Sequence, residues 1–145
     1  MKAKNTLRKY ERLTFTKQID YLFEHGRWLR SNHIRMIYRI PDSDIQAQAC
    51  VMFSVPKKLH RKAVKRNLLK RRMRESYRLQ KNNFYNSLRG LNVQLNLGFV
   101  YSSEEITDYK TIKREVKLLV AQLISRIQKE PQLSNRTGES FFSKL

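Results

Sequence analysis

The sequence predicts an α+β fold in which helices pack on a small sheet of about three to four strands. Segments 33–40, 45–55 and 93–101 alternate between apolar and polar residues, which is typical of half-buried strands. Segments 16–25, 57–78 and 108–130 instead carry apolar residues at the spacing of one helix face. The expected order of elements is therefore α-β-β-α-β-α.

The first helix and the first strand are marked by short local signals. Thr16 offers an N-cap, Ile19, Leu22 and Phe23 form an i, i+3, i+4 face, and Gly26 supplies the stop. The strand at 33–40 then points four apolar side chains one way and two arginines the other. The apolar set is Ile34, Met36, Tyr38 and Ile40, and the arginines are Arg35 and Arg39.

The second strand, 45–55, follows after a short polar link, which predicts an antiparallel pair with 33–40. Pro56 ends it. Segment 81–92 is polar and contains Gly90, so we expect a loop there before the third strand. Thr107 or Asp108 caps the last helix, which Pro131 ends. Its apolar stripe is formed by Ile112, Val116, Leu119, Val120, Leu123 and Ile127.

The composition is that of one strongly basic domain. The 145 residues carry 31 Lys and Arg against 12 Asp and Glu, a net charge of +19, with 40% hydrophobic residues. We expect a single domain at 1–130, with a basic, mobile N-terminal arm at 1–11 and a flexible tail at 131–145. Such a charge predicts a polyanionic partner. No stretch approaches the ~20 apolar residues of a membrane span, and no signal peptide opens the chain, so we expect a cytoplasmic protein.

The predicted helix at 57–78 has two contrasting sides. Leu69, Met73 and Tyr77 form a narrow apolar stripe. From residue 45 to residue 74 there is no acid, while ten Lys and Arg accumulate. The side that carries them is lined by Ala63, Asn67, Lys70, Arg74, Arg78 and Lys81, flanked by Arg66 and Arg71. Like charges at this spacing cost stability unless a polyanion neutralises them, which favours a nucleic-acid surface over a merely solvated face.

The spacing of this helix resembles a family signature. Ala63, Arg66, Asn67, Lys70, Arg71, Arg74 and Glu75 match the pattern A-x-x-R-N-x-x-K-R-x-x-R-E of the bacterial ribonuclease P protein subunit. In that family a strand ending in two lysines precedes the motif, as Lys57 and Lys58 follow 51–55 here. The resemblance covers roughly residues 12–127.

The resemblance implies a function. The subunit belongs to a ribonucleoprotein that removes the 5′ leader of precursor tRNA, in which an RNA using Mg²⁺ is the catalyst. The complex, rather than a dedicated protein site, holds the Mg²⁺. The partners implied are the catalytic RNA and the leader, with no membrane and no required protein partner. The family fold also implies a left-handed strand–helix–strand crossover, against the usual rule. The residues expected to bind RNA are Lys57, Lys58, Arg61, Lys62, Arg66, Asn67, Lys70, Arg71 and Arg74.

The resemblance also implies a cleft for the single-stranded leader. Aromatic faces suit a strand of little fixed sequence, because every base has a π-face. Phe23 is the best match to the cleft aromatics and Tyr38 is next, while Ile19 stands where relatives often carry Phe. Arg35, Arg39 and Lys57 are expected to add charge beside them.

The residues themselves predict no catalytic and no metal site. A protein nuclease needs paired histidines, clustered carboxylates or an activated nucleophile. His25, His33 and His60 share no spacing and are expected at the surface, and the single Cys50 cannot form a site alone. The one tight acid cluster, Glu104, Glu105 and Asp108, suits capping of the last helix better than metal binding.

Two other readings fit a small basic chain. A structural ribosomal protein would bind RNA without stimulating cleavage of precursor tRNA. A basic amphipathic membrane binder would need bulky apolar residues opposite its cations, and the only tryptophan, Trp28, lies outside the basic helix.

Overall fold

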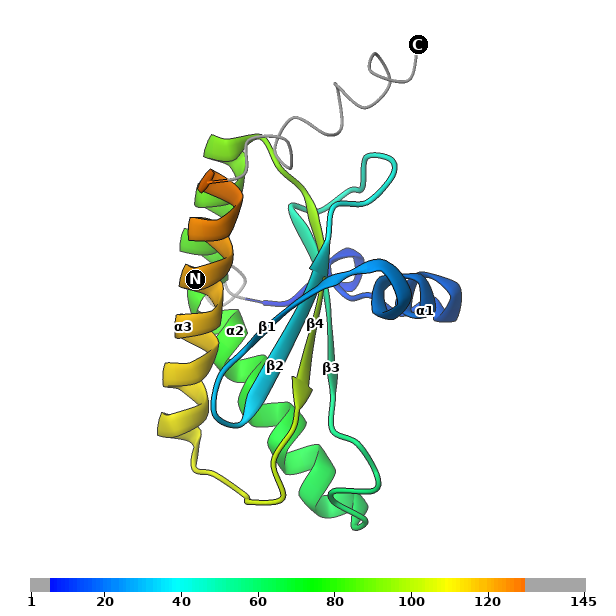
Figure 1. Ribbon diagram of the computed structural model, residues 1–145, viewed down its shortest axis with the longest axis vertical. Helices are drawn as coiled ribbons and strands as arrows, with labels where there is room; N and C mark the ends of the chain where they lie inside the picture. Colours follow the sequence, from blue (N-terminus) through cyan, green and yellow to red (C-terminus); the bar gives the residue numbers. More distant parts are fainter. Residues whose placement is uncertain (1–5, 130–145) are drawn as a thin grey trace.

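A computed structural model describes residues 6–129 and shows three layers (Figure 1). A four-stranded sheet stands in the middle, with one helix on one face and two helices on the other. The elements in chain order are a short 3-10 turn at Lys9–Glu11, α1 (Thr16–His25), β1 (Arg27–Arg30), β2 (Ile34–Arg39), β3 (Ala49–Ser54), α2 (Ala63–Leu91), β4 (Leu95–Tyr101) and α3 (Tyr109–Lys129). The α+β class is confirmed.

The strand order is β1-β2-β4-β3, and the predicted antiparallel pair between β2 and β3 is wrong. β4 lies between them, antiparallel to β2 and parallel to β3. Six of its seven residues are buried, as a central strand requires. The link before β3 is therefore not a hairpin, and the Gln94 side chain holds it by donating to the carbonyls of Ile45 and Ala47.

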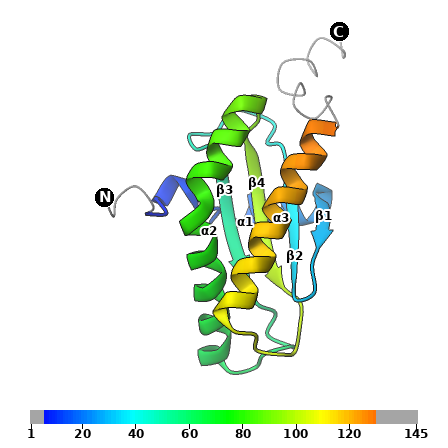
Figure 2. The same ribbon diagram turned by 90° about the vertical axis from the view of Figure 1, so that its left-hand side faces the viewer.

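The connection β3–α2–β4 is a left-handed crossover, as the resemblance implied. With the helices toward the viewer, the chain runs down β3, up α2 and down β4, which lies to the right of β3 (Figure 2). With the strands turned to point upward, β4 is to the left, opposite to the usual hand.

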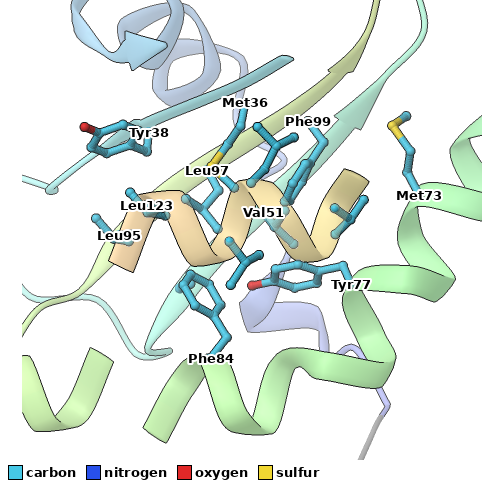
Figure 3. Packing of buried hydrophobic residues seen from close by; sticks show 14 of the residues in the cluster. Met36, Tyr38, Val51, Met73, Tyr77, Phe84, Leu95, Leu97, Phe99 and Leu123 are labelled. Carbon is cyan, nitrogen blue, oxygen red and sulfur yellow. The ribbon is translucent and has the colours of Figure 1, made fainter. Parts of the chain in front are cut away.

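Strand alternation divides the sheet into two different faces. Ile34, Met36 and Tyr38 of β2 join the main core under α2 and α3, together with Leu97 and Phe99 of β4 (Figure 3). Ile37, between them in sequence, points the other way and packs with Leu13 and Leu22 near α1. One helix covers much less of a sheet than two, so the α1 face stays partly open.

The predicted apolar stripes of the helices are confirmed. Leu69, Met73 and Tyr77 of α2 are fully buried, and all six stripe residues of α3 are buried. The side chain of Asp108 accepts a hydrogen bond from the amide of Thr111 at 2.9 Å, so this acid caps α3 as predicted. Gly26 follows α1 as the predicted stop, whereas Thr16 is already helical and Phe15 takes the N-cap position.

The boundaries predicted for α2 are wrong at both ends. Residues 57–62 form a turn in which the amides of Leu59 and His60 donate to the carbonyl of Pro56. The expected loop at 81–92 is helical to Leu91, because Phe84, Tyr85 and Leu88 bury their side chains in the core. The helix ends at Asn92, whose left-handed φ of 58° makes it the cap, and not at Gly90.

The N-terminal segment is also packed, where a mobile arm was expected for residues 1–11. Leu7 is buried in the main core, and Glu11 lies in an ion pair with Lys81 of α2 at 2.8 Å. Tyr85 donates a further hydrogen bond to Glu11 at 2.7 Å. Lys81 therefore lies in the interior and not on the basic side of the helix. Residues 1–5 and the predicted tail at 131–145 lie outside the described residues.

β1 was not among the strands predicted individually. It is only four residues long, and Leu29 is its one buried side chain, so its sequence shows no alternation of apolar and polar residues that would predict a strand. It pairs antiparallel with β2 and forms one edge of the sheet.

The buried pair of Glu11 and Lys81 yields a stability prediction. Burial opposes ionisation of Glu11, but hydrogen bonds from Lys81, the amide of Arg8 and Tyr85 outweigh it and hold its pKa below the ordinary value. Lys81→Met leaves the carboxylate without its cation and should cost about 3–5 kcal/mol in urea unfolding. The matched control is Arg78→Met, which breaks the half-buried i,i+3 pair with Glu75 and should cost about 0.5 kcal/mol. Equal losses in the two variants would contradict a structural role for the buried pair.

A second ion pair predicts a pH dependence of stability. His33, before β2, contacts Glu115 of α3 through its ring at 2.5 Å and its amide at 2.8 Å. The hydrogen bond to Glu115 raises the pKa of His33 despite partial burial. Because folding raises the pKa of His33, the protonated ring stabilises the folded state. This stabilisation is complete below about pH 6.5, the pKa of histidine in the unfolded chain, and is lost as the pH rises through the pKa of the folded state.

The difference in melting temperature between the wild type and His33→Gln should therefore shrink as the pH is raised from about 6 to about 9. The control is His25→Gln, because His25 is exposed at the end of α1. A difference for His33→Gln that stays constant over this pH range would contradict the assignment.

Candidate nucleic-acid interface

The residues predicted to bind RNA lie together on one surface, which we call the basic surface. It consists of the turn before α2 and the first three turns of that helix. None of its members is buried, and most are exposed. They are Lys57, Lys58, Arg61, Lys62, Arg66, Asn67, Lys70, Arg71 and Arg74.

Two side chains hold the turn of the basic surface in place. His60, expected at the surface, is buried, and its ring contacts the carbonyl oxygen of Ser103 at 2.7 Å. Arg66 donates to the carbonyls of His60 at 3.0 Å and Arg61 at 2.7 Å. Arg66 therefore shapes the surface, while Asn67 and Arg71 remain exposed on it.

The acid of the family signature does not neutralise the charge of the basic surface. Glu75 pairs with Arg78 at 2.5 Å, and hydrogen bonding to that arginine lowers the pKa of Glu75 against a smaller effect of burial. Arg74 extends toward the sheet, with its guanidinium 5.9 Å from the ring centre of Phe53 on β3. The cations nearer the start of α2 face solvent.

A second surface lies on the other side of the sheet, beside α1, and we call it the open face. Leu22, Ile37 and the half-buried Ile19 form its apolar floor with Cys50 and Met52. Gly26 permits α1 to end directly on β2, since a Cβ there would lie 2.6 Å from a side-chain carbon of Ile37. Ile19 and Phe23 are thus brought to the same surface.

Exposed aromatic rings and arginines border the open face. Phe23 is 37% exposed and meets Trp28 of β1 edge to face, with ring centres 5.7 Å apart. The guanidinium of Arg35 lies 4.6 Å from the ring centre of Trp28, and the guanidinium of Arg39 lies 4.5 Å from the ring centre of Tyr21. Trp28 and Tyr21 were not predicted as residues of this surface, because the two adjacent apolar residues Trp28 and Leu29, between Arg27 and Arg30, give no alternating pattern.

Tyr38 does not join Ile19 and Phe23. It is 2% exposed and lies in the core on the opposite face of the sheet, where its hydroxyl accepts a hydrogen bond from Arg126 at 3.3 Å (Figure 3). The expectation that it faces the same layer as α1 is wrong by one residue of strand register. Arg35, Ile37 and Arg39 are the β2 residues on that side, and Lys57 is exposed in the turn before α2.

The histidines and the acid cluster are used within the fold. His60 is buried and His33 is half-buried, whereas His25 is exposed as expected; Glu105 reaches His33 at 3.1 Å. Within residues 6–129, no group of three or more His, Cys, Asp or Glu side chains is arranged to hold a metal ion. No helix in that range is long and apolar enough to span a bilayer.

Comparison with known proteins places the chain in a family. The family model for ribonuclease P matches residues 7–124. The ribonuclease P protein component of Porphyromonas gingivalis is 31% identical over 121 residues, covering 83% of this chain and 88% of the relative. That of Chlorobaculum tepidum is 31% identical over 134 residues, covering 86% of each chain.

Solved structures share the fold at lower identity. The RNase P protein of Staphylococcus aureus superposes with a TM-score of 0.61 at 16% identity, covering 79% of this chain and 96% of that one. The RNase P protein of Thermotoga maritima gives a TM-score of 0.60 at 21% identity, covering 77% and 96%. Because the family model spans most of the sequence and the sequence relatives agree with it, the chain belongs to the ribonuclease P protein family.

Proposed function

We propose that this chain is the protein subunit of ribonuclease P, the endoribonuclease that removes the 5′ leader from precursor tRNA. In this proposal the basic surface binds the catalytic RNA and the open face binds the leader. The observation that carries it is the exposed family signature on α2, where Asn67, Lys70, Arg71 and Arg74 lie on one surface with the lysines of the preceding turn.

The chemistry of the basic surface supports binding to a folded RNA. Its cations can neutralise backbone phosphates, which supplies affinity, while the side-chain amide of Asn67 offers both N–H donors and an acceptor oxygen to a base edge or a sugar. Arg66 contributes differently, because its guanidinium is occupied by two backbone carbonyls and fixes the turn that carries Arg61 and Lys62.

The open face supports binding to a single strand. Phe23, Trp28 and Tyr21 offer partly exposed rings for stacking, and Arg35 and Arg39 stand beside them for phosphates. Because the basic surface lies around the start of α2, at the lower end of the molecule in Figure 1, and the open face lies beside α1, one subunit can contact catalytic RNA and leader at the same time.

We place catalysis in the RNA, with Mg²⁺ held by the complex. The titratable groups that are buried here are engaged in structural bonds, as in the pairs of Glu11 with Lys81 and His33 with Glu115. The subunit then acts by strengthening substrate binding, which lowers the Mg²⁺ concentration that the complex needs.

Reconstitution tests this proposal. Purified chain added to a bacterial ribonuclease P RNA at low Mg²⁺ should stimulate cleavage of a precursor tRNA, whereas the chain alone should leave the substrate intact at every Mg²⁺ concentration. RNA binding without any stimulation of cleavage would contradict the proposal, and so would cleavage by the RNA-free protein.

Charge removal on α2 should weaken docking to the catalytic RNA. Lys70→Gln with Arg74→Gln should raise the Kd and make the slope of log K against log salt shallower by about 0.7–0.9 for each lost phosphate contact. The matched control is Lys110→Gln with Lys117→Gln, which removes two exposed cations from α3. An unchanged salt slope in the α2 variant would show that this helix is not the docking surface.

A further inference from the structure

A second groove lies beyond the open face, between β1 and the C-terminal half of α3. Its cavity measures about 540 Å³, larger than the cavity of about 370 Å³ beside Tyr21 and Arg39. Residues of both elements line it: Trp28, Leu29 and Arg30 from β1, and Gln122, Ser125, Arg126 and Lys129 from α3. Neither the two predicted surfaces nor the family signature includes this groove.

The lining of this groove, which we call the edge groove, suits an anionic strand. Three cations border it, and no carboxylate is among its lining residues. Arg126 is held in position by its hydrogen bond to the hydroxyl of the buried Tyr38. Gln122 and Ser125 add neutral donors and acceptors, and such a mixture of cations and short polar groups is typical of contacts to nucleic-acid phosphate and sugar.

Two residues connect the edge groove to the open face. Trp28 lines the groove and also meets Phe23 of α1. Arg30 lines the groove and also a cavity of about 400 Å³ that contains Arg35 and Lys58. β1 is the outermost strand of the sheet on this side (Figure 2), so a ligand on the open face can pass over it without meeting another strand.

We propose that the edge groove binds the distal part of the 5′ leader, which runs from the open face over β1 and places its phosphates between Arg30, Arg126 and Lys129. This inference rests on the proposed binding of the leader to the open face. A flexible single strand can turn over the short β1 edge, whereas a rigid duplex cannot, which favours the leader over a helix of the catalytic RNA as the occupant.

The test compares precursor tRNAs without a leader, with a short leader of about 4 nucleotides and with a long one of about 16, which bracket the site sizes of small single-strand binders. Binding is measured to the holoenzyme reconstituted with a bacterial ribonuclease P RNA. The wild type should gain affinity from the short leader and gain more from the long one. Lys129→Glu should keep the first gain and reduce the ratio of long-leader to short-leader affinity to about 1.

Three further variants locate any loss of affinity. Lys110→Glu reverses an exposed cation on α3 outside the groove and should leave both gains unchanged. Phe23→Ala should reduce the gain from the short leader. Arg126→Gln should behave as Lys129→Glu does, and its melting temperature is measured because it also breaks the bond to Tyr38.

The outcomes separate this inference from the proposed function. If the wild type gains nothing from a leader of any length, leader binding to the open face fails. If the short leader helps but Lys129→Glu retains the full additional gain from the long one, or if the wild type shows no additional gain, the edge groove is not on the leader path. Weaker binding of leaderless tRNA or of the catalytic RNA by Lys129→Glu would assign the groove to another RNA and overturn the inference.

Discussion

The two ladders made by β4 determine the position of every other element. β4 pairs with β2 on one side and with β3 on the other, which ties the N-terminal half of the chain to the segment after α2. The parallel pairing with β3 forces the chain to cross over the sheet, and α2 is that crossover. Once α2 lies on one face, its buried stripe of Leu69, Met73 and Tyr77 faces the sheet, and the cations of its first turns face away.

How far the sequence predicts the fold depends on whether an element's signal is local. α3 could be predicted in detail, because six apolar residues at helical spacing and an acid at the cap are contained within one segment. The strand order could not, because pairing depends on contacts between residues far apart in the chain. Similarly, nothing near Lys81 in the sequence shows that Glu11, seventy residues away, neutralises it in the interior.

The candidate site was predictable to a similar extent. The basic surface follows from a long run without acids, but residues 57–62 form a turn and not part of the helix, and Lys81 lies in the interior. The cleft residues were harder to identify, because a strand exposes alternate residues on opposite faces and one step of register moves Tyr38 from the open face into the core. Trp28 was not predicted as a cleft residue, because β1 is defined by its pairing with β2 and not by an apolar pattern in its own sequence.

The bond between His60 and Ser103 has a consequence for the energetics of binding. It anchors the turn at 57–62 to the segment that follows β4, and Arg66 closes the same turn from the helix side. The backbone of this turn is therefore ordered before any ligand arrives, and ordering it costs about 1–2 kcal/mol per residue of conformational entropy. Folding has already met that cost, so in the proposed complex the four cations on the turn would bind as a pre-organised group, and their contacts should appear mainly as slow dissociation from the RNA.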